Sequence, residues 1–314
     1  MPEAMIAAPV RTRIAVAICT YKRNDFLTRL LDALLVCADR VRDRAAVGVA
    51  IVDDTADGQA RIVADAFAGK FELGVQYRIS GKQNISMARN IAIETAMEMG
   101  DWTAMTDDDC EPPPHWLEAL LDLQQTTGDD AVTGRLVRRV PPDSPRWITE
   151  QPFLELGQEE LPDGGEMKSA ATFNSMVSSS WLKNHPKIRF EPKLGVISGE
   201  DVVFFRACRA AGLKIRFSEK GFVYENEGPE RATFGYQLYV YLWHGNSSYV
   251  GSVESGISPA RMFVHGCASM ARALVRPFGR VVRGQPPQFR YCLALVLHAT
   301  GKMLGPFGVR IDHK

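Results

Sequence analysis

Residues 13–19 read Arg-Ile-Ala-Val-Ala-Ile-Cys, and the next five, Thr20-Tyr21-Lys22-Arg23-Asn24, form a polar segment. A short apolar run that ends at a polar turn is typical of a buried strand in a parallel sheet. Beyond Asn24, which we expect to cap a helix, apolar residues recur at three- and four-residue spacing over 26–35, as on a helix packed against a sheet. The chain therefore opens with a strand followed by a helix.

This strand-helix unit repeats through the first half of the chain. We expect strands at 47–52, 75–79 and 102–106, with helices at 59–68 and 86–99. Such alternation predicts an α/β fold, a parallel sheet with helices on both faces whose ligands bind at the carboxyl ends of the strands. For the second half we expect strands at 131–137, 171–180, 214–217 and 222–225, helices near 113–116 and at 201–211, and a loop at 141–165.

Composition narrows the class of protein. With 46% hydrophobic and 24% charged residues, the 314-residue chain has the composition of a folded globular protein. Its six cysteines form no C-x-x-C pair, which argues against a zinc knuckle or a disulfide framework and fits a reducing cytosol. Residues 1–10 are too short for a signal sequence, and no run of 18 uncharged apolar residues follows. We therefore expect a cytoplasmic protein that does not span a membrane.

Three consecutive acids, Asp107-Asp108-Asp109, follow the strand expected at 102–106. Carboxylates this close raise one another's pKa unless a cation or strong donors neutralise them. Their oxygens suit Mg²⁺ or Mn²⁺, so the triplet indicates a divalent metal at the ligand-binding edge of the sheet. A solvated loop that begins a helix is the alternative.

Several motifs resemble, in order, those of bacterial family 2 glycosyltransferases. The first strand with its Thr20-Tyr21-Lys22-Arg23 turn, the strand ending in Asp53-Asp54, the segment 84–90 (Asn-Ile-Ser-Met-Ala-Arg-Asn) and the acid triplet are similar to that family's motifs. Residues 198–201, Ser-Gly-Glu-Asp, resemble its Gly-Gly-Glu-Asp signature. Tyr224, Glu225, Pro229, Arg231 and Gly245 continue the pattern. Five ordered motifs over about 13–250 are more specific than any one of them. The finer likeness is to exopolysaccharide transferases of the succinoglycan glucosyltransferase type.

The resemblance implies a GT-A fold with a mixed, mainly parallel sheet, and inverting transfer of a sugar from a nucleotide sugar, with UDP expected, to an acceptor hydroxyl. It implies Asp201 as the base that takes the acceptor proton, with Glu200 as the alternative. Asp107 and Asp109 would hold Mg²⁺ or Mn²⁺, and Asp108 would share that task or bind ribose. The remaining donor contacts would come from Thr20, Tyr21, Arg23, Asp54 and Arg89.

Simpler interpretations accompany these assignments. Glu200 and Asp201 begin a helix, where acids stabilise the positive end of the dipole without any catalysis. Tyr21 could pack beneath its loop, and Arg89 could lie on a helix surface. His244 lies beside a tryptophan, and we leave it out of the catalytic set. Departures from the family pattern at Lys22, Ser198 and 55–56 remove no carboxylate.

The last 55 residues differ in charge from the rest. Residues 260–314 hold nine basic residues and one acid, although the whole chain is neutral. Arg272, Arg276, Arg280 and Arg283 recur at helical spacing among apolar residues, which predicts an amphipathic helix pair, broken at 286–287, on an anionic membrane surface. Helices packed on the domain, with the arginines in solvent or at a dimer contact, are the alternative.

These observations predict a glycosyltransferase domain at 1–258, with a nucleotide-binding half at about 13–110 and an acceptor half at about 111–258. A basic amphipathic tail would follow at 259–314. We expect a glycan or lipid-linked oligosaccharide acceptor, no nucleic-acid partner, and a place on the inner face of the cell membrane. A nucleotidyltransferase fits less well, because 20–24 contain no glycine-rich phosphate loop. A non-catalytic carbohydrate- or lipid-binding module is the third hypothesis.

Overall fold

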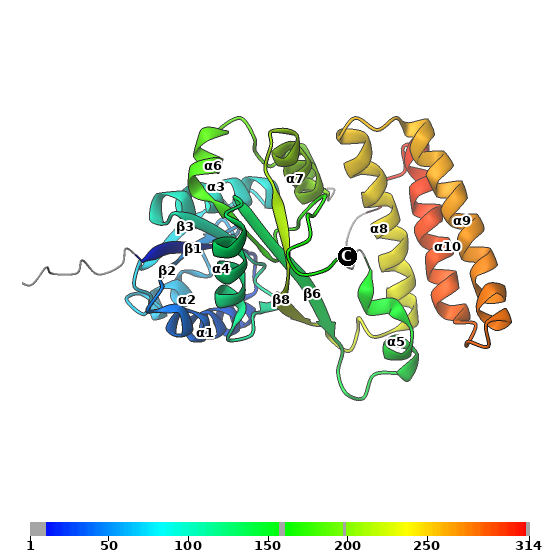
Figure 1. Ribbon diagram of the computed structural model, residues 1–314, viewed down its shortest axis with the longest axis horizontal. Coiled ribbons are helices and arrows are strands. Elements are labelled where there is room, and N and C mark those ends of the chain that lie inside the picture. The colour runs from blue at the N-terminus through cyan, green and yellow to red at the C-terminus, as the bar shows by residue number, and fades with distance from the viewer. Residues whose placement is uncertain (1–10, 157–160, 197–198, 312–314) are drawn as a thin grey trace, which may run out of the picture.

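The computed structural model describes residues 11–156, 161–196 and 199–311, so residues 1–10, Ser198 and Asp312, on which expectations also fall, lie outside it. Its centre is an eight-stranded sheet of order β3-β2-β1-β4-β7-β6-β8-β5 (Figure 1). The strands are β1 (Thr12–Thr20), β2 (Ala45–Asp53), β3 (Val75–Ile79), β4 (Trp102–Met105), β5 (Cys110–Glu111), β6 (Ala131–Arg139), β7 (Ser175–Ser178) and β8 (Ile215–Asn226).

The sheet is mixed and mainly parallel, as expected. β1 to β4 pair in parallel, and β6 pairs in parallel with β8. β7 runs antiparallel between β4 and β6, and β5 is antiparallel to β8 at the sheet edge. The parallel half therefore brings the ends of β1, β2 and β4 to one edge, and β5 brings the segment after β4 to the end of β8.

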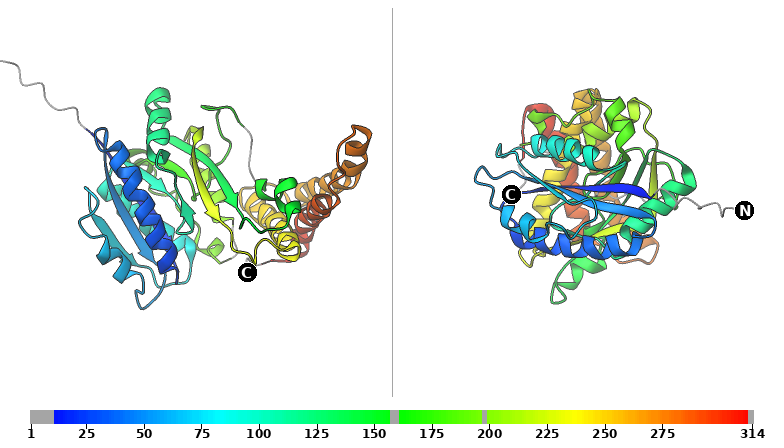
Figure 2. Two further views of the ribbon diagram at one scale, coloured as in Figure 1. Left: turned by 90° about the horizontal axis from the view of Figure 1, so that it is seen from below. Right: turned by 90° about the vertical axis from the view of Figure 1, so that its left-hand side faces the viewer.

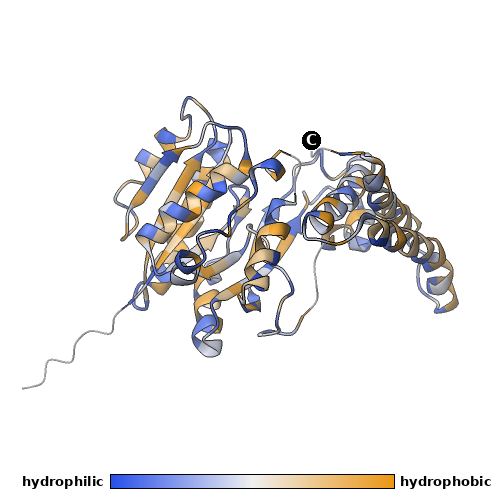
Figure 3. Ribbon diagram, turned by 90° about the horizontal axis from the view of Figure 1, so that it is seen from above, coloured by the Kyte–Doolittle hydropathy of each residue, from blue (hydrophilic) through white to orange (hydrophobic). Residues whose placement is uncertain are grey.

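Helices cover both faces of the sheet because successive side chains of its strands point to opposite sides. Ile14, Val16 and Ile18 of β1 pack toward one face, and Ala15 and Ala17 toward the other. The first core includes residues of α1 (Asn24–Val41), α2 (Arg61–Ala66) and α4 (Trp116–Thr127); the second includes residues of α3 (Ile85–Met99), α6 (Ser179–Asn184) and α7 (Glu200–Ala210). Figure 3 shows the apolar strands enclosed between these layers.

Some expected elements differ from those observed. The strand expected at 171–180 is confined to β7, the helix expected at 59–68 to α2, and the two late strands are the single strand β8. The expected loop at 141–165 contains α5 (Arg146–Glu150) and the 3₁₀ turn η1 (Pro152–Glu155); its residues 157–160 lie outside the described part. Asn24 does not cap α1, because its side chain donates to the carbonyl of Gln59 at 3.0 Å.

Three helices form the C-terminal end of the molecule. They are α8 (Phe234–Glu254), α9 (Pro259–Val282) and α10 (Phe289–Leu304), and the break between the last two confirms the interruption predicted at 286–287. α8 and α10 pack closely, since a Cβ on Gly245 would lie 2.0 Å from the carbonyl oxygen of His298. Figure 2 shows α9 and α10 as a pair projecting away from the sheet. Two further 3₁₀ turns are η2 (Pro192–Leu194) and η3 (Gly305–Phe307).

Among the described residues, none of the helices combines the length and the apolar character that crossing a membrane requires.

Candidate active site

The predicted site residues follow strands that end at one edge of the sheet. β1 lies between β2 and β4 and is parallel to both, so the segments after Thr20, Asp53 and Met105 meet there. The starts of α3 and α7 reach the same place, because Arg89 and Glu200 form an ion pair. Five segments that are far apart in the sequence therefore converge on one site.

The acid triplet is held by the loop after β1. Asp108 accepts hydrogen bonds from Thr20 Oγ1 at 2.8 Å and from Arg23 Nη1 at 3.1 Å. Arg23 Nη1 also donates to Asp109 Oδ2 at 2.9 Å. Burial raises the pKa of Asp108 to about 6, and the opposing charge of Arg23 offsets only part of this effect. Thr20, Arg23 and the two aspartates thus form one hydrogen-bonded unit.

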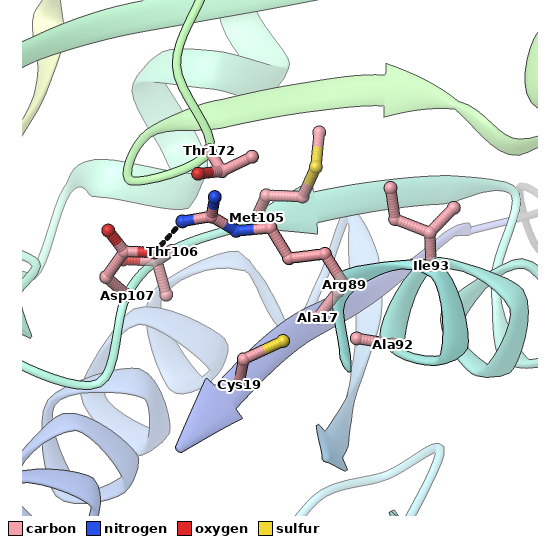
Figure 4. Close-up of a pocket in the computed structure, with 9 residues that line it drawn as sticks. All are labelled: Ala17, Cys19, Arg89, Ala92, Ile93, Met105, Thr106, Asp107 and Thr172. Atoms are coloured by element: carbon pink, nitrogen blue, oxygen red, sulfur yellow. Dashed lines mark hydrogen bonds and ion pairs between the residues drawn. The ribbon is translucent and has the colours of Figure 1, made fainter. Parts of the chain in front are cut away.

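Arg89 connects the triplet to α7. Figure 4 shows its guanidinium directed at Asp107, where Nη2 lies 3.3 Å from Oδ1. Nη1 pairs with Oε1 of Glu200. Although burial opposes its charge, the carboxylates of Asp107 and Glu200 raise the pKa of Arg89, so it stays protonated. A small cavity of about 10 Å³ is lined by Arg89 and Asp107 together with Thr106 and Thr172. Thr106 Oγ1 has no hydrogen-bond partner among the described residues.

The pair Glu200 and Asp201 begins α7 directly after Gly199, whose φ of 91° few other residues adopt. Glu200 is buried, and its second oxygen, Oε2, lacks a hydrogen-bond partner among the described residues. Asp201 is half-buried and accepts a hydrogen bond from the amide of Val202. Burial, followed by the neighbouring charge of Glu200, raises the pKa of Asp201 to about 6. Of the two carboxylates, Glu200 pairs with an arginine, whereas Asp201 forms no ion pair with any described residue.

Asp54 is buried and stabilises the loop before α3. Its two oxygens accept from one hydroxyl and three backbone amides, those of Ser80, Lys82, Gln83 and Asn84, at 2.7–3.0 Å. This loop carries Asn84, which caps α3 by accepting from the amide of Met87. Tyr21, in the turn after β1, is 39% exposed. The predicted donor contacts of Asp54 and Tyr21 stay predictions.

Two further acids, Glu225 of β8 and Glu227 of the loop after it, lie next to the acid cluster. Glu225 pairs with Cys110 in the register of β5 and β8, which sets it beside Asp109. Burial, followed by the charges of Asp109 and Glu227, raises the pKa of Glu225 to about 7. Arg231 contacts Glu225 at 3.3 Å and Glu227 at 3.4 Å. Glu225 had a signal in the sequence, its match to the family pattern, but that match carried no chemical role, and Glu227 had no such signal.

The fit of a divalent cation can be judged from the donor set. Among the described residues, no three His, Cys, Asp or Glu side chains are grouped closely enough to enclose an ion. Asp107 pairs with Arg89 through Oδ1, and Asp109 pairs with Arg23 through Oδ2. The chemistry of these carboxylates suits Mg²⁺ or Mn²⁺. In the present arrangement, Arg23 and Arg89 supply the neutralising charge.

The fold is that of GT-A glycosyltransferases. S. aureus TarS 1–349, solved in complex with UDP, matches with a TM-score of 0.51 at 13% identity, over 95% of this chain and 92% of that one. The same protein in complex with UDP-GlcNAc matches with a TM-score of 0.51 at 12% identity, over 94% and 92%. The acid cluster at the carboxyl ends of the parallel strands thus lies in an enzyme fold.

The sequence identifies the family. The family model described as glycosyl transferase family 2 matches residues 15–185. The succinoglycan biosynthesis protein ExoM of Rhizobium meliloti (strain 1021) is 30% identical over 228 residues, which cover 71% of this chain and 70% of that protein. The chain therefore belongs to glycosyl transferase family 2 and is a glycosyltransferase. This membership confirms the predicted enzyme class over the nucleotidyltransferase and the non-catalytic module.

Proposed function

We propose that this chain transfers a sugar from a UDP-sugar onto a hydroxyl of a growing exopolysaccharide, with inversion at the anomeric carbon. The name of the succinoglycan biosynthesis relative supports the polysaccharide. The UDP and UDP-GlcNAc complexes of TarS, a protein of the same fold, support the donor. The observation that carries the proposal is a half-buried carboxylate, Asp201, beside the charged cluster of Asp107 and Arg89.

Asp201 is the proposed catalytic base. An acceptor hydroxyl is a weak nucleophile, so a carboxylate must take its proton as the oxygen attacks the anomeric carbon. A pKa of about 6 makes Asp201 a stronger base than an ordinary aspartate, while it remains ionised at neutral pH. Glu200 is the alternative, but its carboxylate already pairs with Arg89, and we assign it a positioning role.

The donor is proposed to lie over the ends of β1, β2 and β4. Arg89 is proposed to bind the diphosphate, with Thr20, Arg23 and Asp108 beside it, and Tyr21 and Asp54 are the proposed contacts of the nucleobase. Asp107 and Asp109 would hold a Mg²⁺ or Mn²⁺ ion, whose chemistry when bound is to neutralise the charge that grows on the leaving diphosphate. Because both arginines pair with these acids, donor binding is expected to exchange carboxylate contacts for phosphate contacts.

The C-terminal tail is proposed to hold the enzyme on the inner face of the cell membrane. Leu274, Val275, Phe278 and Val282 are 57–88% exposed on α9, and they alternate with its arginines. An amphipathic basic helix of this kind binds anionic lipid surfaces. A lipid-linked oligosaccharide acceptor fits such a position. The glycosyltransferase domain is proposed to end at residue 258 and the tail to begin at residue 259, although α8 of the domain packs along α10 of the tail.

The experiment that tests the proposed function measures released nucleoside diphosphate. Purified protein is incubated with UDP-, GDP- and dTDP-sugars, with and without Mn²⁺ or Mg²⁺, and with a bacterial membrane lipid extract as the acceptor. We expect metal-dependent release of UDP from one donor, accompanied by sugar incorporation into the lipid fraction. Incorporation from a GDP- or dTDP-sugar alone would contradict the proposed donor, and the absence of incorporation from every donor would contradict the proposed reaction.

A further inference from the structure

The small cavity beside Arg89 has two kinds of wall. One is polar and consists of Arg89 and Asp107 together with Thr106 and Thr172. The other is apolar and is formed by side chains of β1, α3 and β4, namely Ala17, Ala92, Ile93 and Met105. Cys19, near the end of β1, completes the lining. A volume of about 10 Å³ is close to the smallest that holds one water molecule, so the cavity has room for a single oxygen-sized group.

The two threonines of the polar wall are almost completely buried. Thr106 is 2% exposed and Thr172 is 4% exposed. Because Thr106 Oγ1 lacks a hydrogen-bond partner among the described residues, its burial is costly. Figure 4 shows the hydroxyl of Thr172 on the side that faces the guanidinium of Arg89. The polar wall can therefore bind one further polar group.

The position of the cavity relates it to the sugar of the donor. Asp107 is a proposed ligand of the cation that binds the diphosphate, and its side chain is 38% exposed, so the cavity lies directly beside accessible surface. Arg89 pairs with Glu200, which precedes the proposed base Asp201. In the proposed reaction the anomeric carbon is bonded to the diphosphate and is attacked by the oxygen whose proton Asp201 takes. The sugar ring therefore lies between Asp107 and Asp201, beside the cavity.

We infer that this cavity receives one hydroxyl group of the donor sugar, and that Thr106 and Thr172 select for that hydroxyl. The inference rests on the proposed function, because it requires a nucleotide-sugar donor at this site. The sugar hydroxyl donates to one threonine oxygen and accepts from the other, which gives Thr106 Oγ1 the partner that it lacks. Ile93 and Met105 limit the space on the apolar side, so a larger substituent would overfill the cavity.

A buried water molecule is the alternative occupant. It would bind the same hydroxyls with or without a donor, and losing it would change the stability of the fold and not the recognition of the sugar. The experiment must therefore measure stability and donor recognition separately.

The test compares Thr106→Val and Thr172→Val with the wild type, because valine keeps the size of threonine and removes its hydroxyl. Calorimetry measures the donor Kd, the transfer assay measures kcat and KM for the accepted UDP-sugar, and thermal unfolding measures Tm. Each variant should raise the donor Kd and KM about fivefold, the effect of losing one hydrogen bond, while kcat changes less than twofold. Tm should not fall in Thr106→Val, because the hydroxyl that it removes has no partner among the described residues.

Deoxy analogues of the same donor identify the hydroxyl that is bound. Each analogue lacks a different hydroxyl of the sugar, and each is titrated into the wild type and both valine variants. One analogue should bind the wild type about fivefold more weakly than the parent donor does, and the valine substitutions should not weaken its binding further. The other analogues should lose as much affinity on valine substitution as the parent donor loses, because they keep the hydroxyl that the threonines contact.

Two variants serve as controls. Thr95→Val removes a hydroxyl of α3 that is 5% exposed, donates to the carbonyl of Ile91 and lies outside the cavity lining, so the donor Kd should not change. Thr172→Ser keeps the hydroxyl and should keep most of the donor affinity. Thr106→Val gives a result even where Thr172→Val fails to fold.

An unchanged donor Kd in both valine variants would overturn the inference. Analogues that all respond alike to the valine substitutions would also overturn it, and would indicate that the threonines hold a water molecule. A wild type that binds the donor with the expected sensitivity but transfers no sugar would contradict the proposed function and leave the assignment of the cavity standing.

Discussion

The arginines of this chain occupy two contrasting environments. At the active site, Arg23 and Arg89 each contact two carboxylates, and the acids around them are largely buried. On α9, the arginines at 272, 276, 280 and 283 form no ion pair with any described residue, although Arg276 lies 5.1 Å from the ring of Tyr291. Exposed apolar side chains surround them. Charge is therefore neutralised within the protein at the first place and left for an external partner at the second.

This difference separates two ways of binding an anion. A diphosphate bound in the proposed way would have to displace carboxylates from Arg23 or Arg89, so geometry and a cation would decide whether it binds. An anionic surface at α9 displaces only water and counterions, so its binding should scale with the number of arginines and fall with salt. In the proposed function, the first arrangement would give specificity and the second would give attachment.

The largest effect is expected from a substitution that removes the proposed base and leaves the ion pairs of the active site in place. Asp201→Asn removes the proposed base but leaves both arginines with their partners. Because general-base catalysis contributes about 10²–10⁴-fold, we expect kcat for transfer to fall about 10³-fold, with the donor Kd unchanged. Steady-state kinetics and donor titration by calorimetry measure the two quantities.

Glu200→Gln is the matched variant, because it weakens the contact with Arg89 and keeps Asp201. It should reduce kcat less than Asp201→Asn does. Wild-type kcat should also decline below pH 6, where Asp201 becomes protonated. If Glu200→Gln were the more damaging change and Asp201→Asn retained most activity, the base would be Glu200.

The second effect addresses the arginines of α9. Replacing the four at 272, 276, 280 and 283 by glutamine should weaken binding to phosphatidylglycerol vesicles roughly 700-fold, because each arginine near an anionic surface contributes about 1 kcal/mol and the four together about 4 kcal/mol. Vesicle co-sedimentation at two salt concentrations measures the change. Hydrolysis of the nucleotide sugar in solution should be unaffected, since these residues lie far from the acid cluster in the chain and the fold (Figure 1).

A four-lysine variant keeps the charge and should retain most of the vesicle binding. Phe278→Ser tests the apolar part separately, because this ring is 71% exposed. Wild-type protein that ignores anionic vesicles but dimerises in sedimentation experiments would show that the arginines and their apolar neighbours form a subunit contact instead.

The sequence predicted features that depend on local patterns, and it did not predict contacts between residues that are distant in the chain. The order of strands and helices, the parallel arrangement of β1 to β4 and the two tail helices followed from hydrophobic periodicity, which reports burial. The pairing of Arg89 with Asp107 and Glu200 did not, because it joins residues 18 and 111 positions apart through tertiary contact. The motifs predicted that these residues share one site, and the structure brings Arg89, Asp107 and Glu200 into contact; the predicted phosphate contact of Arg89 stays a prediction.

Elements with weak periodicity were predicted least well. The turn-rich segment 141–165 showed only proline, glycine and charge, so its short helix α5 was missed. Trp147 and Ile148 of that helix are held by the aromatic cluster around Phe153 and Tyr241. This packing involves α8 and α10, which lie some 90 to 140 residues away, and no local pattern carries that information.

A third effect concerns how Asp108 couples the stability of the fold to pH. The pKa of this buried carboxyl is about 6 in the folded protein, above the ordinary value of about 4. The folded state therefore binds the proton more tightly than the unfolded state, so this group's stabilising contribution is present below pH 4 and is lost as the pH rises through 6. A shift of two units corresponds to about 2–3 kcal/mol in the free energy of unfolding.

Urea unfolding of the wild type and of Asp108→Asn at pH 4 and pH 7.5 isolates this contribution. The stability of the wild type minus that of the variant should fall by about 2–3 kcal/mol between the two pH values. Asp43→Asn, at an exposed position, should show no such trend. A difference that grows with pH would mean that Arg23 stabilises the Asp108 anion more than burial destabilises it.

The smallest expected effect tests whether the charges of Arg23 and Arg89 stay neutralised by carboxylates of the protein or are neutralised by a bound diphosphate. If Asp107 and Asp109 bind Mn²⁺ when their arginines turn to a diphosphate, Mn²⁺ with UDP should raise Tm by about 2 °C more than the sum of the two ligands added singly. Differential scanning fluorimetry measures this excess, which requires no turnover. Asp107→Asn and Asp109→Asn should each remove it, whereas Asp43→Asn should keep it. Additive shifts in the wild type would mean that the arginines remain on their carboxylates when UDP binds, and that the cation is held elsewhere.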